Sequence, residues 1–229
     1  MTTIYSITRE VLYQSDKPLK EAVEAAVAEG VSLEHANLAN ADLRNANLQG
    51  ADLERANLTG ARLPFANLSG ANLTCARVHL ANFCGAKLTG ADLDEADFVS
   101  ANLSQANLAG AEGSYFNLEG ANLSHANLAG VELVSAIVQL ANFAPDTLKG
   151  ATIDGHAIIS AITFGPLGSR NDKLLAALTD DGFYFQTGCF FGTKKELLAA
   201  VESTHGGTRH ERDYKLAIDF LEAYLKDRE

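Results

Sequence analysis

The chain has 229 residues, of which 47% are hydrophobic, so it is long enough for one or two domains with buried cores. No apolar run approaches the ~18 residues of a membrane-spanning helix, and the N-terminus lacks the charged and apolar regions of a signal peptide. Three widely spaced cysteines (Cys75, Cys84, Cys189) argue against a disulfide framework. We therefore expect a cytoplasmic protein without a membrane partner. The net charge of −11 argues against direct nucleic-acid binding, which needs Lys and Arg, and leaves a basic protein partner open.

Residues 1–30 are expected to form a separate N-terminal segment. Residues 3–15 are rich in β-branched and aromatic side chains, which predicts one or two short strands. Ser15-Asp16-Lys17-Pro18 then indicates a helix start, with a capping side chain ahead of an early proline. The helix that follows would be amphipathic and would end at Gly30; its apolar face consists of Leu19, Ala22, Val23, Ala26 and Val27.

A five-residue repeat dominates the sequence from Val31 to Gly155. Alanine recurs at every fifth position, and Leu, Val, Ile or Phe stands two places after it, over 25 consecutive units. Neither a helix nor a plain strand has this period. A short fixed period indicates one structural unit stacked on its neighbours, which is a solenoid.

The repeat A-[DN]-L-x-x resembles the pentapeptide-repeat family. That resemblance implies a mainly β fold, a right-handed quadrilateral β-helix with four pentapeptides per coil, in which alanine and the central leucine point inward. We expect this tube over residues 31–160, with the preceding helix covering its open N-terminal end. Residues 161–229 depart from the repeat and are expected to form a small α+β module.

A 20-residue spacing of glycines supports four units per coil. These glycines are Gly30, Gly50, Gly70, Gly90, Gly110, Gly130 and Gly150. The spacing predicts a corner with positive φ or a close approach between stacked backbones. The repeat is irregular at Gly113, which takes a central position, and at Phe116, which takes a small-residue position. We expect the Phe116 ring to fill the space that Gly113 leaves, although a bulge or looped excursion is the alternative.

The C-terminal module is expected to contain a hairpin and two helices. Asp181-Gly182 stands between two apolar runs and predicts the hairpin turn. Thr193 and Glu196 form a capping-box pattern before a helix. A last helix is expected near 210–226, with an apolar face of Tyr214, Ala217, Ile218, Leu221 and Leu225. This run resembles a C-terminal module of some bacterial and phage pentapeptide-repeat proteins, and the resemblance implies no activity.

Sorting the repeat into four sides places the charge on one of them. The side that starts at Val31 has a net charge of −8, with nine carboxylates and Arg55. We expect partner-binding residues on this side at Asp52, Glu54, Asp92, Asp94, Glu95, Glu112 and Glu132. The alternative is a face that is acidic only for solvation. A cation site is disfavoured because a flat column of carboxylates does not converge on an ion, and we expect no metal and no cofactor.

The sequence therefore predicts a non-enzymatic scaffold, an acidic rod that docks a basic protein. Family members that protect DNA gyrase resemble B-DNA in size and charge, which makes DNA-mimic-like binding to a protein such as a topoisomerase a special case. Those members favour Phe at the central position and dimerise, whereas Leu dominates here. A homodimer remains open for this chain.

A second hypothesis is a small-ligand, anion-binding or catalytic site in the C-terminal module, with the solenoid as a spacer. The polar residues that could form it are Arg170, Asn171, Asp172, Cys189, His205 and His210. A glycine-rich loop with an arginine can bind an anion, and a Cys–His pair can act as nucleophile and base. A structural turn at Asn171-Asp172 and a buried Cys189 are the alternatives.

Overall fold

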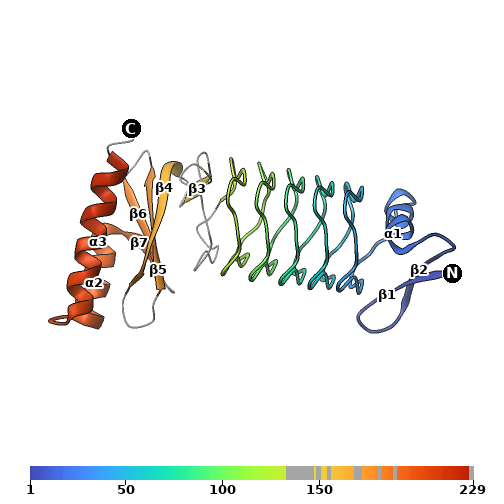
Figure 1. Cartoon of the computed structure of the whole chain (residues 1–229), viewed down its shortest axis with the longest axis horizontal. Helices are drawn as coiled ribbons and strands as arrows, with labels where there is room; N and C mark the ends of the chain where they lie inside the picture. The colour runs from blue at the N-terminus through green and yellow to red at the C-terminus, as the bar shows by residue number, and fades with distance from the viewer. Residues whose placement is uncertain are drawn as a thin grey trace.

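The computed structural model describes residues 1–132, 147, 151–153, 156–167, 172–179, 182–187 and 190–226. The molecule is elongated (Figure 1). Along its long axis lie, in order, an N-terminal cap, a tube of stacked coils, and a sheet that carries two helices. In the described ranges, no helix has both the length and the apolar character needed to cross a membrane.

The N-terminal cap consists of a hairpin and one helix. Strands β1 (Thr2–Tyr5) and β2 (Val11–Ser15) confirm the predicted short strands and pair antiparallel, and α1 spans Leu19–Ala28. The predicted capping side chain is wrong. Pro18 itself holds the N-cap position and makes no side-chain cap bond, while Ser15 Oγ accepts a hydrogen bond from the nearby Lys17 N–H at 3.2 Å.

Helix α1 closes the first coil of the tube, as expected. Its residues Ala22, Val23 and Ala26 are fully buried in the same core as the tube. Within the tube, a residue such as Asn67 donates its N–H to a carbonyl of the preceding coil. No coil precedes Asn47, and its N–H donates instead to Glu24 Oε1 on α1 at 2.8 Å. The helix therefore satisfies a backbone donor at the open end as well as covering apolar surface.

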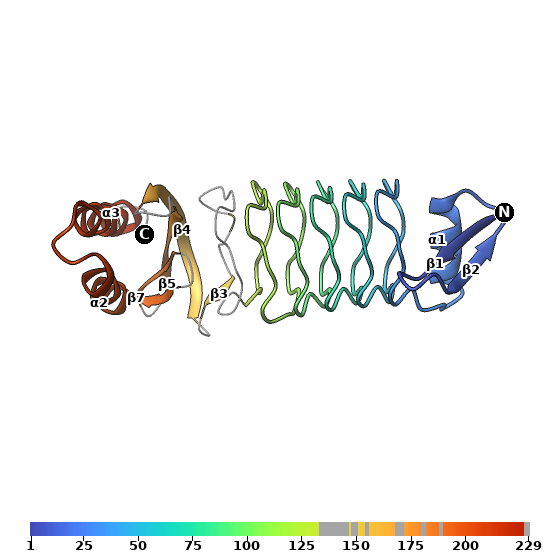
Figure 2. The same cartoon turned by 90° about the horizontal axis from the view of Figure 1, so that it is seen from below.

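The tube is a parallel ladder with a repeat of 20 residues. Bridges join residues 20 apart, from Asn37↔Asn57 to Asn107↔Asn127, and Glu132↔Thr152 keeps the same spacing. Successive coils lie side by side along the tube in both views (Figures 1 and 2). Four pentapeptides per coil are thereby confirmed, while the right-handed sense stays a prediction.

Alanine and the central residue point inward in each unit. All the alanines and leucines at these positions between Leu33 and Leu128 are at most 5% exposed. The larger central residues Phe83 and Phe98 are also fully buried, and their rings meet at a centroid distance of 5.6 Å. Uniform small and branched side chains therefore fill a narrow interior at every level.

The fifth residue of every unit from Gly30 to Gly130 has a positive φ, between 53° and 79°. The predicted positive φ of the glycine column is confirmed, but it is common to all four corners. Phe65, Cys75 and Leu80 adopt it too, although a non-glycine residue in this conformation costs about 1–2 kcal/mol. Close backbone approach does not explain Gly50, because no atom lies within 4 Å of a Cβ built there.

The irregular unit at Gly113 keeps the register of the tube. Bridges Asp92↔Glu112 and Asp97↔Asn117 flank it with the usual spacing, so the substitution occurs without an insertion. Phe116 is 1% exposed, which places its side chain in the core.

The C-terminal module is built on an antiparallel sheet with the order β3-β4-β5-β6-β7. Its strands are β3 (Thr152–Ile153), β4 (His156–Leu167), β5 (Asp172–Thr179), β6 (Phe183–Thr187) and β7 (Phe190–Thr193). The predicted β5–β6 hairpin is confirmed by the pair Leu178↔Phe183, while Asp181 lies outside the described residues. Strand β4 crosses residue 160, where the sequence placed the end of the tube.

Both faces of this sheet are covered. On β5, Leu175 and Ala177 belong to the core of the tube, whereas Leu174, Ala176 and Leu178 belong to a second core formed with the helices. The sheet therefore closes the C-terminal end of the tube, and the helices pack on its far face (Figure 1).

The two helices begin and end close to their predicted positions. Helix α2 (Lys194–His205) starts with the predicted capping box, in which Thr193 and Glu196 bond each other's backbone N–H. Helix α3 (Arg209–Lys226) buries its predicted face at Tyr214, Ala217, Ile218 and Leu221, and the Leu225 side chain lies outside the described part.

Candidate functional site

One side of the tube carries most of its charge. We call acidic face the side formed by residues 31–35, 51–55, 71–75, 91–95, 111–115 and 131–132. Eight carboxylates and one guanidinium lie there, a net charge of −7. Asp154, the ninth carboxylate of the sequence pattern, lies outside the described residues.

The half of the acidic face near the N-terminal cap is partly neutralised within the chain. Arg55 Nη1 lies 3.4 Å from Glu34 Oε1 and also bonds Glu54. Asp52 accepts hydrogen bonds from Ser32 Oγ at 2.5 Å and from Asn72 Nδ2 at 3.3 Å. Two of these three carboxylates therefore already share a cation within the chain.

The half of the acidic face nearer the C-terminus is different. Among the described residues, Asp92, Asp94, Glu95 and Glu112 make no ion pair. Within the described ranges, these side chains accept hydrogen bonds from neutral donors: the Asp94 N–H bonds Asp92 at 3.0 Å, the Ser114 N–H bonds Asp94 at 2.8 Å, and the Cys75 thiol bonds Glu95 at 3.6 Å.

These four carboxylates stand on two adjacent coils. The backbones of Asp92 and Glu112 form a β-bridge, which places the two side chains next to each other. In full water exposure such a pair repels by less than about 1 kcal/mol, so the fold tolerates it. Further along the same side, Glu132 accepts a hydrogen bond from Thr152 Oγ1 at 2.7 Å.

Carboxylates on the other sides are mostly paired. Asp42 binds Arg44 through two bonds, Nε to Oδ1 at 2.8 Å and Nη2 to Oδ2 at 2.7 Å, and Arg62 lies 3.6 Å away. The hydrogen bonds from Arg44, and to a smaller extent the charge of Arg62, hold the pKa of Asp42 below its ordinary value. Asp97 pairs with His79 at 2.5 Å.

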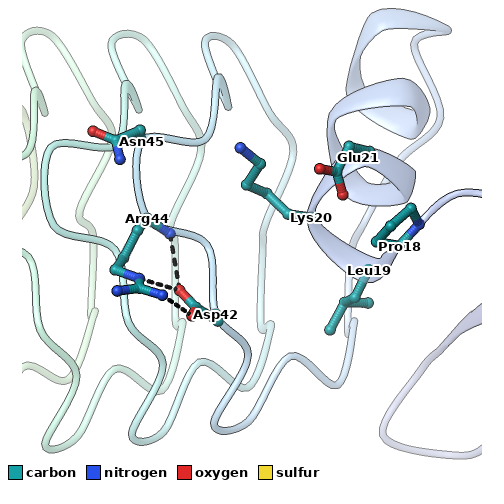
Figure 3. A pocket seen from close by; sticks show the side chains of 7 residues that line it. All are labelled: Pro18, Leu19, Lys20, Glu21, Asp42, Arg44 and Asn45. Atoms are coloured by element: carbon teal, nitrogen blue, oxygen red, sulfur yellow. Dashed lines mark hydrogen bonds and ion pairs between the residues drawn. The ribbon is translucent and has the colours of Figure 1, made fainter.

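A hollow of about 480 Å³ lies between the cap and the first coils (Figure 3), lined by Pro18, Leu19, Lys20, Glu21, Asp42, Arg44 and Asn45. Figure 3 shows the Arg44 guanidinium turned onto the Asp42 carboxylate. The guanidinium and the carboxylate that line this hollow therefore bond each other, and the hollow lies where α1 meets the tube.

Within the part of the chain that the structure describes, no group of three or more His, Cys, Asp or Glu side chains is arranged to hold a metal ion. Asp52, Asp92 and Glu112 stand at the same position of successive or alternate coils, so the carboxylates of the acidic face form a column of hydrogen-bond acceptors.

The predicted C-terminal site falls largely outside the described residues. Arg170, Asn171 and Cys189 lie there, as does the side chain of Asp172, so their convergence stays a prediction. His205 and His210 do come together, with ring centroids 5.7 Å apart, where α2 gives way to α3. His205 also stacks on Tyr214 at 5.9 Å, which gives these rings a packing role between the helices.

Sequence reasoning missed the ion pair between Glu34 and Arg55. Because a coil has 20 residues, side chains about 20 positions apart lie on neighbouring coils. The separation of 21 residues between Glu34 and Arg55 could therefore have indicated this ion pair. The same rule applies to Asp42 and Arg62, and to His79 and Asp97, which are 18 apart.

The ladder of 20-residue coils and its inward Ala and Leu define the molecule as a β-helical solenoid. The sequence model of pentapeptide repeats matches it with 8 copies, over residues 25–60, 36–74, 51–90, 76–112 and 114–143. Together these segments cover more than half of the chain. The chain therefore belongs to the pentapeptide-repeat family.

Solved structures of pentapeptide-repeat proteins are similar to parts of this chain. HetL of the cyanobacterium Nostoc, a protein involved in the regulation of heterocyst differentiation, is 38% identical over 55% of this chain and 59% of its own, with a TM-score of 0.20. A protein of the Arabidopsis thaliana thylakoid lumen is 32% identical over 44% of this chain and 63% of its own, with a TM-score of 0.27. This chain thus spans less than two thirds of either. No curated protein matches it.

Proposed function

We propose that this chain is a cytoplasmic, non-enzymatic interaction scaffold whose acidic face binds a protein rich in Lys and Arg. The observation that carries the proposal is the group of four carboxylates, Asp92, Asp94, Glu95 and Glu112. They stand on two adjacent coils without a cation from the described residues, whereas most carboxylates elsewhere on the tube are paired.

The rigidity of the tube favours this role. Each carboxylate is fixed to a hydrogen-bonded ladder, and stacked coils repeat at about 4.8 Å, so binding would order little more than the side chains themselves. Complementary charge mainly speeds association and selects the partner, and its effect weakens as salt rises. Asp52, Glu54 and Glu132 extend the proposed surface along the tube.

The charge density bears on which partner is favoured. A net charge of −7 over a tube of roughly 30 Å gives about one charge per 4 Å, against one per ~1.7 Å in duplex DNA. The surface is therefore closer to an acidic protein patch than to DNA, and a DNA-handling protein such as a topoisomerase is a special case of the proposed partner.

The test is an affinity capture from a bacterial lysate at low and at moderate salt. The face variant carries Asp92→Asn, Asp94→Asn, Glu95→Gln and Glu112→Gln. A matched control variant loses the same number of negative charges away from the tube, at exposed positions: Glu10→Gln, Asp16→Asn, Glu21→Gln and Glu202→Gln.

We expect a basic protein to be held by the wild type and by the control variant, to be lost from the face variant, and to be released by salt. Identical protein sets on the face variant and the wild type would refute the proposal, because the acidic face would then serve solvation alone. If the partner is lost from both variants, binding depends on the overall charge of the chain and the proposal is also refuted.

A further inference from the structure

A second hollow, of about 280 Å³, opens at the corner between the acidic face and the next side of the tube. It is lined by Ile7, His35, Arg55, Asn57, Cys75 and Arg77. No carboxylate lines it, although the chain has a net charge of −11. The hollow is therefore lined by cationic and neutral hydrogen-bond donors in a molecule that is acidic as a whole.

The tube places these residues by its 20-residue register. His35, Arg55 and Cys75 occupy the same corner on three successive coils, and Asn57 pairs with Arg77 on the adjoining side. Ile7 comes from the loop between β1 and β2, where its N–H donates to His35 O at 2.8 Å. The lining is therefore fixed by backbone bonds in two separate parts of the fold.

Three side chains have donors to offer. Arg55 uses Nη1 for Glu34 and Glu54, which leaves its Nε and Nη2 hydrogens. Asn57 Oδ1 accepts from Thr59 N–H at 3.1 Å, so its amide hydrogens remain. Arg77 is exposed and makes no ion pair within the described ranges.

The other lining groups are His35, Cys75 and Ile7. His35 Nε2 is directed at Glu34 Oε1, 3.3 Å away. The Cys75 thiol is directed at Glu95, and burial, followed by that carboxylate, raises the pKa of the thiol, which keeps it neutral. Together with Ile7, these groups give the hollow an apolar wall beside the donors.

We propose that this hollow binds a compact organic oxyanion, a carboxylate or phosphate monoester that carries a short apolar group. A guanidinium can hold either head group through two parallel hydrogen bonds, and the apolar group would pack on Ile7. The volume is below the ~300–1,000 Å³ typical of pockets for drug-sized ligands, so the ligand is a head group with a few carbons. His35, Arg55 and Cys75 of the acidic face line this hollow, whereas Asp92, Asp94, Glu95 and Glu112, the carboxylates of the proposed protein-binding surface, do not.

The test follows the methyl signal of Ile7 by NMR in the full chain labelled at isoleucine methyls, at constant ionic strength. The probes are isovalerate, inorganic phosphate and isoamyl alcohol, the last a neutral molecule with the same tail as isovalerate. We expect a saturable shift with isovalerate and none with the alcohol. Comparing isovalerate with phosphate identifies the preferred head group.

The variant Arg77→Gln should weaken binding at least about tenfold, because it removes a charged hydrogen bond. Arg62→Gln is the matched control, since Arg62 is an exposed arginine at the equivalent position of the neighbouring side, and we expect it to bind as the wild type does. If Arg77→Gln fails to fold, Arg77→Lys keeps the charge without the planar fork and should still weaken binding.

The proposal is overturned by any of three results: no saturable shift with either anion, a shift with the alcohol equal to that with isovalerate, or unchanged affinity in the Arg77 variant. None of these results bears on the proposed protein binding by Asp92, Asp94, Glu95 and Glu112, which do not line the hollow.

Discussion

Restoring the repeat pattern at Gly113 should destabilise the protein. The substitution Gly113→Leu introduces the residue found at most central positions of the tube. Gly113, however, has a φ of 150°, and a Cβ there would lie 2.7 Å from the Leu93 carbonyl carbon and 2.8 Å from the Asp94 nitrogen. Both atoms belong to backbone, so the clash cannot be relieved by turning a side chain.

The magnitude follows from strain and overpacking, each worth about 1–3 kcal/mol, so we expect a loss of about 3 kcal/mol. Phe116→Ala alone should cost about 3–5 kcal/mol, because it empties a fully buried site. If the Phe116 ring compensates for Gly113, the double variant relieves the overpacking, while the backbone clash at Gly113 remains. Its loss should then fall short of the sum of the two single losses by about 1–3 kcal/mol.

The assay is urea unfolding of the full chain followed by circular dichroism, on the wild type, both single variants and the double variant. Gly110→Ala is the control, since its φ is 64° with open space around a Cβ, and it should cost only about 1 kcal/mol. A Gly113→Leu protein as stable as the wild type would refute the clash. Strictly additive losses would refute the compensation by Phe116.

Two further predictions concern the cap and a thiol. Glu24→Ala should lower the free energy of unfolding by about 1–2 kcal/mol, because the Asn47 N–H loses its acceptor; the same unfolding assay should show almost no change for Glu21→Ala on the same helix, and equal losses would contradict the capping role. Cys75 should be alkylated more slowly than a free cysteine at neutral pH, because burial and Glu95 raise its pKa and so reduce the thiolate. Glu95→Gln should speed the reaction, measured by mass spectrometry, and an unchanged rate would leave burial as the whole cause.

Much of the tube could be predicted because each coil contacts its neighbours in the same way. The inward or outward direction of a residue such as Leu53 or Asp92 follows from its position in the repeat, and side chains 20 apart must be neighbours. The predicted strands, hairpin and capping box outside the repeat also rested on local patterns, and local patterns are the part of a fold that a sequence states most directly.

Other features had no period to reveal them. The helix cap at Pro18 was mispredicted because a polar residue upstream of a proline can bond its own turn, as Ser15 does. The sequence left a homodimer open and did not indicate what closes the C-terminal end of the tube. In the structure the sheet closes the tube, because β5 alternates between two apolar cores and α3 covers only one of its faces.

The sequence by itself determined the solenoid, its 20-residue coil and the concentration of acid on one side, since these depend only on which residue type recurs at which position. Tertiary structure alone decided which carboxylates are neutralised. Arg55 pairs with Glu34 and Glu54, while Asp92 and Glu112 are left to solvent or a partner. It also decided that the β1–β2 loop brings Ile7 beside Arg55 and Arg77. The physical reason is that the repeat does not constrain the rotamers or the neighbours of outward side chains. These are set only when the coils and the cap are assembled.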